Sequence, residues 1–140
     1  MTANHQHPGR RALTLGAAAG AVGLGAGCAG PGASRGAEPG AVPSAPVALG
    51  SAADVPVGGA KVFPEQRLLV SQTEPGAFRA FSAVCTHQGC AISTVRETAA
   101  LCPCHGSGFD ATTGEVLYGP AREPLPEVPV RVSGDGLVAG

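Results

Sequence analysis

The stretches CTHQGC at residues 85–90 and CPCHGSGFD at residues 102–110 hold four of the five cysteines and two of the four histidines in this chain of 140 residues. Cysteine and histidine are common metal ligands in proteins. Gly-Ser-Gly at 106–108 lets the backbone turn inside the second stretch. This concentration in two short windows predicts one shared site.

The segments around the two windows read as short β-strands. Apolar runs separated by turn residues recur, and no stretch after residue 46 sustains helical periodicity. Each window directly follows a strand, so both become loops held at strand ends by a rigid frame. The pattern favours an all-β fold, a small antiparallel sandwich or open barrel. The expected strands are 67–71, 78–84, 93–96, 98–101, 115–118, 128–133 and 137–138, with Val128, Val130 and Val132 on one face.

The spacing within each window predicts a ligand set. In an extended backbone, residues i and i+2 point to the same side, so Cys85 and His87 can reach one centre. Cys102 and His105 are three residues apart, a separation that one tight loop can close. Each window therefore supplies one cysteine and one histidine ligand, which leaves Cys90 and Cys104 as spare cysteines.

Two kinds of metal centre suit two cysteines and two histidines. A structural zinc ion would be tetrahedral with these ligands, but zinc sites commonly pair C-x2–4-C with H-x3–5-H, unlike the mixed spacing here. A [2Fe–2S] cluster with two cysteines on one iron and two histidines on the other accounts for all four residues. The cluster is the prediction, and zinc stays the alternative.

The two windows resemble the two cluster-binding loops of Rieske iron–sulfur proteins. The family pattern C-x-H-x-x-C followed by C-P-C-H-G-S is matched at all four ligands, at both spare cysteines, and at Pro103, Gly106 and Ser107. The runs FDATTGEV and YGPAREPLP are also similar to segments that follow the second loop in this family. The resemblance covers about residue 46 to the end. It implies a Rieske-like fold of the exported, disulfide-containing type found in the Rieske subunit of cytochrome bc1-type complexes.

The resemblance implies a role for each ligand. Cys85 and Cys102 would bind the inner iron, and His87 and His105 the outer iron, which accepts the electron. Two ferric ions, two sulfides and two thiolates sum to zero charge with neutral imidazoles, whereas a cluster with four thiolates is a dianion. Adding an electron to a neutral centre costs less in a low-dielectric loop. The reduction potentials of the family are accordingly higher, about −150 to +300 mV, than the value of about −400 mV for plant-type clusters with four thiolates.

The resemblance also implies what surrounds the cluster. Ser107 would donate a hydroxyl hydrogen bond to a cluster sulfur, and Phe109 stands where respiratory members carry a tyrosine that gives a second such bond. Cys90 and Cys104 would form a disulfide between the two loops, worth roughly 3 kcal/mol for a loop of about 15 residues. Tyr118 is expected to be a packing residue. The proline loop that shields the cluster would contain Gly119, Pro120, Pro124 and Pro126.

The first 27 residues differ in composition from the rest. Arg10 and Arg11 precede the uncharged run ALTLGAAAGAVGLGAG, which predicts a twin-arginine-type export signal over residues 1–27. A membrane-spanning helix is the alternative, but the run is short and rich in Gly and Ala for a core about 30 Å thick. Small residues before Cys28 resemble a lipoprotein cleavage site, so Cys28 is the expected lipidation site, with an ordinary signal-peptidase cut as the alternative. Residues 28–45 read as a flexible Gly/Pro/Ala-rich linker, and residues 46–140 as the Rieske domain.

Composition and motifs together narrow the function. A formal net charge of −1 with scattered Arg and Lys gives no basic patch for nucleic acid. No nucleophile–base pair stands out, so we expect an electron carrier or an electron-transfer subunit of an oxidoreductase rather than a stand-alone catalyst.

The expected protein holds one [2Fe–2S] cluster and is tethered, by lipid or by its signal segment, to the outer face of a bacterial cytoplasmic membrane. Its expected partners are redox proteins such as a cytochrome or an oxidoreductase subunit, with quinol as a further candidate. The alternatives are the iron–sulfur subunit of a quinol–cytochrome c reductase (bc1) complex and a structural zinc-binding domain.

Overall fold

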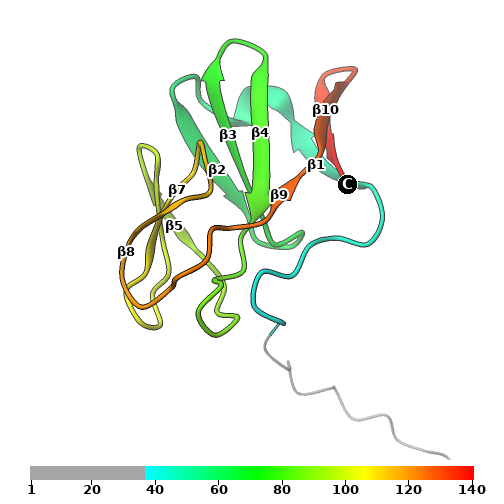
Figure 1. Ribbon diagram of the computed structural model, residues 1–140. Coiled ribbons are helices and arrows are strands. Elements are labelled where there is room, and N and C mark those ends of the chain that lie inside the picture. The colour runs from blue at the N-terminus through cyan, green and yellow to red at the C-terminus, as the bar shows by residue number, and fades with distance from the viewer. Residues whose placement is uncertain (1–36) are drawn as a thin grey trace, which may run out of the picture. The chain divides into compact units, whose positions relative to one another are not determined.

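The computed structural model describes residues 37–140 (Figure 1). The expected signal segment at 1–27 and the expected lipidation site, Cys28, lie outside these residues. Among residues 37–140, no helix has the length and the apolar character needed to cross a membrane. The regular structure of this part of the chain is eleven β-strands and one short 3-10 helix, η1 (Ala52–Asp54).

The strands pair antiparallel in three sheets, and within each sheet they follow one another in a fixed spatial order. The first sheet runs from β1 (Val47–Ser51) through β11 (Gly136–Ala139) to β10 (Val130–Ser133). The second runs through β2 (Gly59–Phe63), β3 (Leu68–Glu74), β4 (Ala77–Ser82) and β9 (Glu127–Val128). The third runs through β5 (Thr94–Arg96), β6 (Ala99–Leu101), β7 (Gly108–Asp110) and β8 (Val116–Tyr118).

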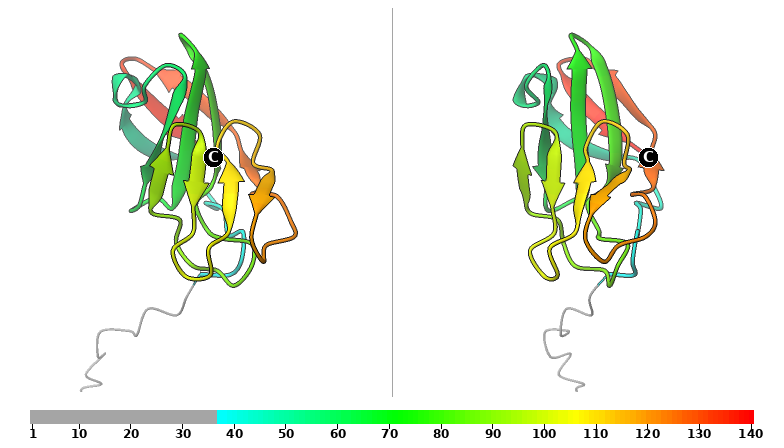
Figure 2. Two further views of the ribbon diagram at one scale, coloured as in Figure 1. Left: turned by 90° about the vertical axis from the view of Figure 1, so that its left-hand side faces the viewer. Right: turned by 60° about the vertical axis from the view of Figure 1, so that its left-hand side comes forward.

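The second sheet is the middle layer and is buried on both faces (Figures 1 and 2). Leu69 and Phe81 pack on one face with Phe109 of the third sheet. Leu68 packs on the opposite face with Leu137 of the first sheet. Neighbouring strand residues project to opposite faces, so a strand between two layers needs apolar side chains at successive positions. This explains the unbroken LLV run in β3, each member of which contributes about 1.5–3 kcal/mol by burial.

The expected all-β antiparallel fold is confirmed, and one expected strand is wrong. Val128, Val130 and Val132 were expected on one face, but Val128 belongs to β9 and pairs with β4, whereas Val130 and Val132 belong to β10 and pair with β11. Pro129 separates the two strands and has no N–H to donate to a ladder. The run therefore serves two sheets, and Val132 stays 51% exposed.

Three strands carry no clear sequence signal. β1 and β2 are interrupted or preceded by glycines, which weaken strand propensity. β7 starts at Gly108 inside the second window, where the cysteines and histidine dominate the pattern. Pairing with neighbouring strands decides the conformation of all three.

Candidate metal centre

The first window forms a closed loop between β4 and β5. The N–H of Cys85 donates to the carbonyl of Cys90 at 2.8 Å, and the N–H of Gly89 donates to the carbonyl of Cys85 at 2.9 Å. Gly89 has a φ of 73°, in the left-handed region that favours glycine. The backbone itself therefore fixes the positions of Cys85, His87 and Cys90 relative to one another.

The second window, between β6 and β7, has the same hydrogen-bond frame. The N–H of Cys102 donates to the carbonyl of Ser107 at 2.9 Å, and the N–H of Gly106 donates to the carbonyl of Cys102 at 3.2 Å. Gly106 has a φ of 75°. In both loops a cysteine opens the turn and a glycine four residues later closes it. The two loops thus repeat one backbone design, with Cys85 and Cys102 at equivalent positions.

The two imidazoles meet where the loops approach each other. The Nδ1 atoms of His87 and His105 lie 3.3 Å apart, and the rings are nearly perpendicular, at 83°, with centroids 4.7 Å apart. Two nitrogens on one tetrahedral ion, at bonds of about 2.0–2.1 Å, lie about 3.3–3.4 Å from each other. The pair therefore has the spacing of two ligands of one metal ion. His87 is partly exposed and His105 is exposed, so this edge of the site faces solvent.

The two free thiols lie on the inner side. Cys85 is 1% exposed and Cys102 is 2% exposed. The pKa of the Cys102 thiol is raised, and burial is the largest cause. The adjacent Cys85 thiol also raises this pKa, whereas hydrogen bonds from the backbone N–H groups of Cys104 and His105 lower it by less. A buried thiolate needs a neighbouring cation, which a metal centre held by Cys85 and Cys102 would supply.

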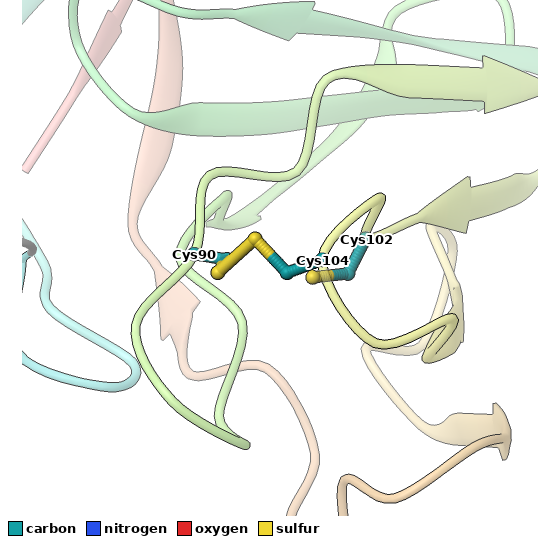
Figure 3. A group of neighbouring side chains, drawn as sticks. All are labelled: Cys90, Cys102 and Cys104. Carbon is teal, nitrogen blue, oxygen red and sulfur yellow. A yellow bond between two sulfur atoms is a disulfide. The ribbon is translucent and has the colours of Figure 1, made fainter.

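The spare cysteines are joined, as expected. Cys90 and Cys104 form a disulfide across the two loops, with 6.4 Å between their Cα atoms (Figure 3). The sulfur of Cys102 lies within 4.8 Å of both disulfide sulfurs. Disulfide sulfurs are not thiolates, so this three-sulfur group does not make a metal site of its own. The donor set that remains is two buried thiols and two surface imidazoles, which fits a cluster with sulfur ligands on one iron and nitrogen ligands on the other.

Residues 119–126 cover the second loop and contact the first. The Oγ of Ser107, which is fully buried, accepts a hydrogen bond from the N–H of Ala121 at 3.2 Å. A Cβ on Gly119 would lie 2.5 Å from the Cα of Ser107, so only glycine allows this close approach. The hydroxyl of Thr86 donates to the carbonyl of Glu123 at 2.6 Å. A cavity of about 560 Å³ beside His87 is lined by this segment, including Gly119, Pro120, Arg122 and Glu123.

Residues 37–41, which the sequence predicts to be part of a linker, contact the same end of the domain. A Cβ on Gly89 would collide with the carbonyl group of Ala37. The hydroxyl of Ser82 donates to the carbonyl of Ala41 at 2.5 Å. A Cβ on Gly40 would lie 3.1 Å from Pro126. The chain therefore enters the described domain alongside the first loop and residues 119–126.

Two aromatic residues near the site differ in exposure. Phe109 is fully buried and packs in the same apolar cluster as Cys85 and Cys102. Tyr118, expected to be a packing residue, lies with its ring against Gly108, yet 54% of the residue is exposed.

Several contacts at the site escaped sequence reasoning. These contacts use backbone groups, which every residue type carries, so side-chain patterns do not predict them. The groups are the N–H of Ala121 and the carbonyls of Glu123 and Ala41. The only indication in the sequence was Gly89 and Gly119, because glycine often occurs where another backbone segment approaches closely. The presence of glycine does not indicate which segment makes the approach.

Comparisons with known proteins agree with this geometry. A family model described as the Rieske [2Fe-2S] domain matches residues 45–129. The cytochrome b6-f complex iron-sulfur subunit of Chlorobaculum thiosulfatiphilum is 39% identical over 93 residues, which cover 64% of this chain and 50% of that protein. The cytochrome bc1 complex Rieske iron-sulfur subunit of Streptomyces lividans is 45% identical over 62 residues, which cover 42% of this chain and 36% of that protein. This chain thus spans about half of the first relative and about a third of the second.

The fold comparison gives the same family. The crystal structure of the cyanobacterial plasma membrane Rieske protein PetC3 from Synechocystis PCC 6803 superposes with a TM-score of 0.55 at 33% sequence identity. The match covers 67% of this chain and 98% of that chain. The two proteins therefore share one domain of similar extent.

Proposed function

This chain belongs to the Rieske [2Fe–2S] domain family, and on that premise we propose that it passes single electrons to or within a respiratory or other oxidoreductase chain, at the outer face of a bacterial cytoplasmic membrane. One [2Fe–2S] cluster is the family's cofactor, and when bound it takes up and releases one electron. The observation that carries the proposal is the convergence of two buried thiols and two imidazole nitrogens from two loops joined by a disulfide.

The proposed ligands are Cys85 and Cys102 on the inner iron, and His87 and His105 on the outer iron. The exposure of the four side chains supports this order, because both thiols are buried whereas the imidazoles reach the surface. The shared frame of the two loops holds each cysteine at the start of its turn. The imidazole edge is then the part of the site that a redox partner can approach most closely.

Ser107 is proposed to donate its hydroxyl hydrogen toward a cluster sulfur. Its oxygen already accepts the N–H of Ala121, which orients the hydroxyl and leaves its hydrogen free for a second partner. A donor at that position favours the state with more negative charge, which is the reduced state. Residues 119–121 pack directly against Ser107 on this side of the site.

The cellular location is also a proposal. We assign residues 1–27 to a twin-arginine-type signal, residues 28–45 to a linker and residues 46–140 to the domain, with Cys28 as the lipidation site. The disulfide between Cys90 and Cys104 supports export, because disulfides persist in oxidising compartments and are rare in the cytosol. The plasma membrane relative supports a membrane location.

A second candidate function is the iron–sulfur subunit of a quinol–cytochrome c reductase. The observation that favours it is the named role of the relatives, which are subunits of cytochrome b6-f and bc1 complexes. In that case, the imidazole edge would meet quinol and a cytochrome partner. The discriminating observation is co-purification: a subunit would leave the membrane with cytochromes b and c1, and a free carrier would not.

Cofactor analysis of the full chain, produced in a bacterial host that matures iron–sulfur clusters, tests the proposal. We expect two iron atoms and two acid-labile sulfides per chain, and a paramagnetic resonance signal from a mixed-valence di-iron centre after anaerobic reduction. Zinc as the sole metal, with no such signal, would refute the proposal and establish the zinc alternative. Fractionation of the native host tests the location, since the proposal expects the chain in the membrane fraction with an oxidised Cys90–Cys104 pair.

A further inference from the structure

The third sheet carries a pocket on its outer face, next to the second loop. Figure 2 shows this sheet in front of the rest of the domain. The strand register places Thr94, Leu101, Gly108 and Tyr118 in one row across the four strands, and the row borders the loop. The pocket has a volume of about 340 Å³, within the usual range for ligand sites. Its lining includes Arg96, Thr94, Leu101, Tyr118, Cys102 and Ser107, and neither histidine of the site.

Tyr118 presents a rigid aromatic surface at this pocket. Tyr118 is 54% exposed, yet its ring packs closely over Gly108 of the neighbouring strand. The packing is so close that a Cβ on Gly108 would lie 2.5 Å from the ring Cζ. A ring that already packs against backbone on one face has less conformational freedom to lose when a partner covers its other face. Tyrosine is enriched at protein interfaces for this reason and because its hydroxyl can bond to a polar partner.

Arg96 is the one charged residue among those that line the pocket. The ion pairs within residues 37–140 join Lys61 to Asp54 and Arg79 to Glu127, so Arg96 takes part in neither. Asp110 stands in the same cross-strand row as Arg96, with Ala99 between them. Its carboxylate accepts hydrogen bonds from the backbone and hydroxyl of Thr112. The guanidinium is therefore available to a carboxylate from outside the chain.

We propose that this pocket is an electron-exchange surface for a redox protein that presents acidic side chains, separate from the exposed edge at His87 and His105. The inference rests on the proposed function, because Cys102 lines the pocket and is a proposed ligand of the inner iron. A partner seated on Tyr118 and Arg96 would approach the site from the side of Cys102. One electron crosses between cluster and partner, and no atom is transferred. With two such surfaces, a donor and an acceptor can bind at the same time.

Binding at the pocket can be measured without electron transfer. The sequence has one tyrosine, so 3-fluorotyrosine labelling gives a single ¹⁹F resonance that reports on Tyr118. We expect the redox-inert trianion hexacyanocobaltate(III) to shift this resonance saturably in the holoprotein at an ionic strength of about 0.1 M. Arg96→Gln should weaken this binding by about fivefold or more, whereas Arg131→Gln, an equal charge change at an exposed position of β10, should leave it unchanged. No saturable shift, or equal binding by R96Q, would overturn the proposal.

Electron exchange at the pocket is tested by stopped-flow oxidation of the reduced holoprotein with ferricyanide, which takes one electron per molecule. R96Q should slow the second-order rate by about threefold to tenfold, and R131Q by less than about twofold. Arg122→Gln removes the same charge beside His87 and serves as the competitor. A slowing by R96Q no greater than that by R131Q would overturn the proposal, whatever the effect of R122Q at the imidazole edge. A protein without iron would instead refute the proposed function, and the ¹⁹F titration would still report on the pocket.

Discussion

The buried hydroxyl of Ser107 and the backbone N–H of Ala121 form a hydrogen bond of 3.2 Å that joins the second loop to residues 119–126. Replacing Ser107 by Ala removes the hydroxyl proposed to donate to the cluster, so the reduced state loses more stabilisation than the oxidised state. A hydrogen bond to a charged group is worth about 1.5–3 kcal/mol, which corresponds to a fall in midpoint potential of about 60–130 mV. Redox titration of the holoprotein measures it.

Ser71→Ala is the matched control for that variant. Ser71 is also a fully buried serine, but it lies in β3 and its hydroxyl has no hydrogen-bond partner within the described residues. Its replacement should leave the midpoint potential unchanged. Equal shifts in the two variants would contradict the role given to Ser107.

The midpoint potential of the wild-type protein should lie below the top of the Rieske range and above that of clusters with four thiolates. Phe109 fills the position at which respiratory members place a tyrosine hydroxyl, and its ring is buried in the cluster of apolar side chains that includes both thiols. By that family resemblance, one donor to the cluster sulfurs would be missing in this chain. A measured value near +300 mV, the upper end of the family, would refute this use of Phe109.

Loss of the Cys90–Cys104 disulfide should destabilise the domain. The double variant C90S/C104S frees a loop that spans a sequence separation of 14 residues. The expected loss is about 3 kcal/mol, or roughly 12–24 °C in Tm for a domain of about 100 residues. Thermal unfolding followed by circular dichroism measures it, and wild-type protein unfolded with a thiol reductant should approach the same Tm. Unchanged stability in both samples would show that the disulfide is not a structural brace.

Asp110 should make the free energy of unfolding of the domain depend on pH in the acid range. Partial burial raises the pKa of its carboxyl, but hydrogen bonds from Thr112 and the backbone of Thr113 outweigh that effect, so the pKa is lowered. A carboxyl with a depressed folded-state pKa contributes stability above its unfolded pKa of about 3.9, and this contribution is lost as the pH falls through the folded-state pKa. Asp110→Asn should therefore be less stable than wild type at pH 7, with a difference that shrinks below about pH 4.

Denaturant unfolding at several pH values provides that comparison. Asp135→Asn is its control, because the Asp135 side chain makes no hydrogen bond with the described residues and lies in the β10–β11 turn. A pH profile of D110N that runs parallel to the wild-type profile down to about pH 2 would contradict the assignment.

Gly89→Ala should cost more stability than its backbone angle alone explains. Gly89 and Gly58 have nearly equal φ values, 73° and 75°, so alanine at either site carries a similar left-handed strain of about 1–2 kcal/mol. A Cβ at Gly58 meets nothing within 4 Å, whereas a Cβ at Gly89 meets the backbone of Ala37. The excess destabilisation of G89A over G58A in urea unfolding measures the contact between residues 37–41 and the first loop. Equal losses would show that this contact contributes nothing.

The sequence indicated the site better than it indicated the frame around it. Cysteines and histidines are few in this chain, so their grouping in two windows pointed to the four proposed ligands and to the disulfide between Cys90 and Cys104. Their convergence depends on long-range strand pairing, which spacing along the chain does not encode. The contacts of Ala121, Glu123 and Ala41 use backbone atoms that every residue carries, so no pattern of side chains could have revealed them.

The strand errors have a different physical origin. A periodic run such as VPVRVS indicates that alternate residues share a face, but it does not say which sheet each half joins. Pro129 ends one ladder, and the chain moves to another sheet within a single residue. The exposure of Val132 follows from this change of sheets and not from its residue type.

The backbone of Ala37 packs against Gly89, two residues after His87, so the first described residues share one end of the domain with the first loop (Figure 1). A partner that docks at the imidazole edge would therefore meet the backbone of residues 37–41 as well as the two loops.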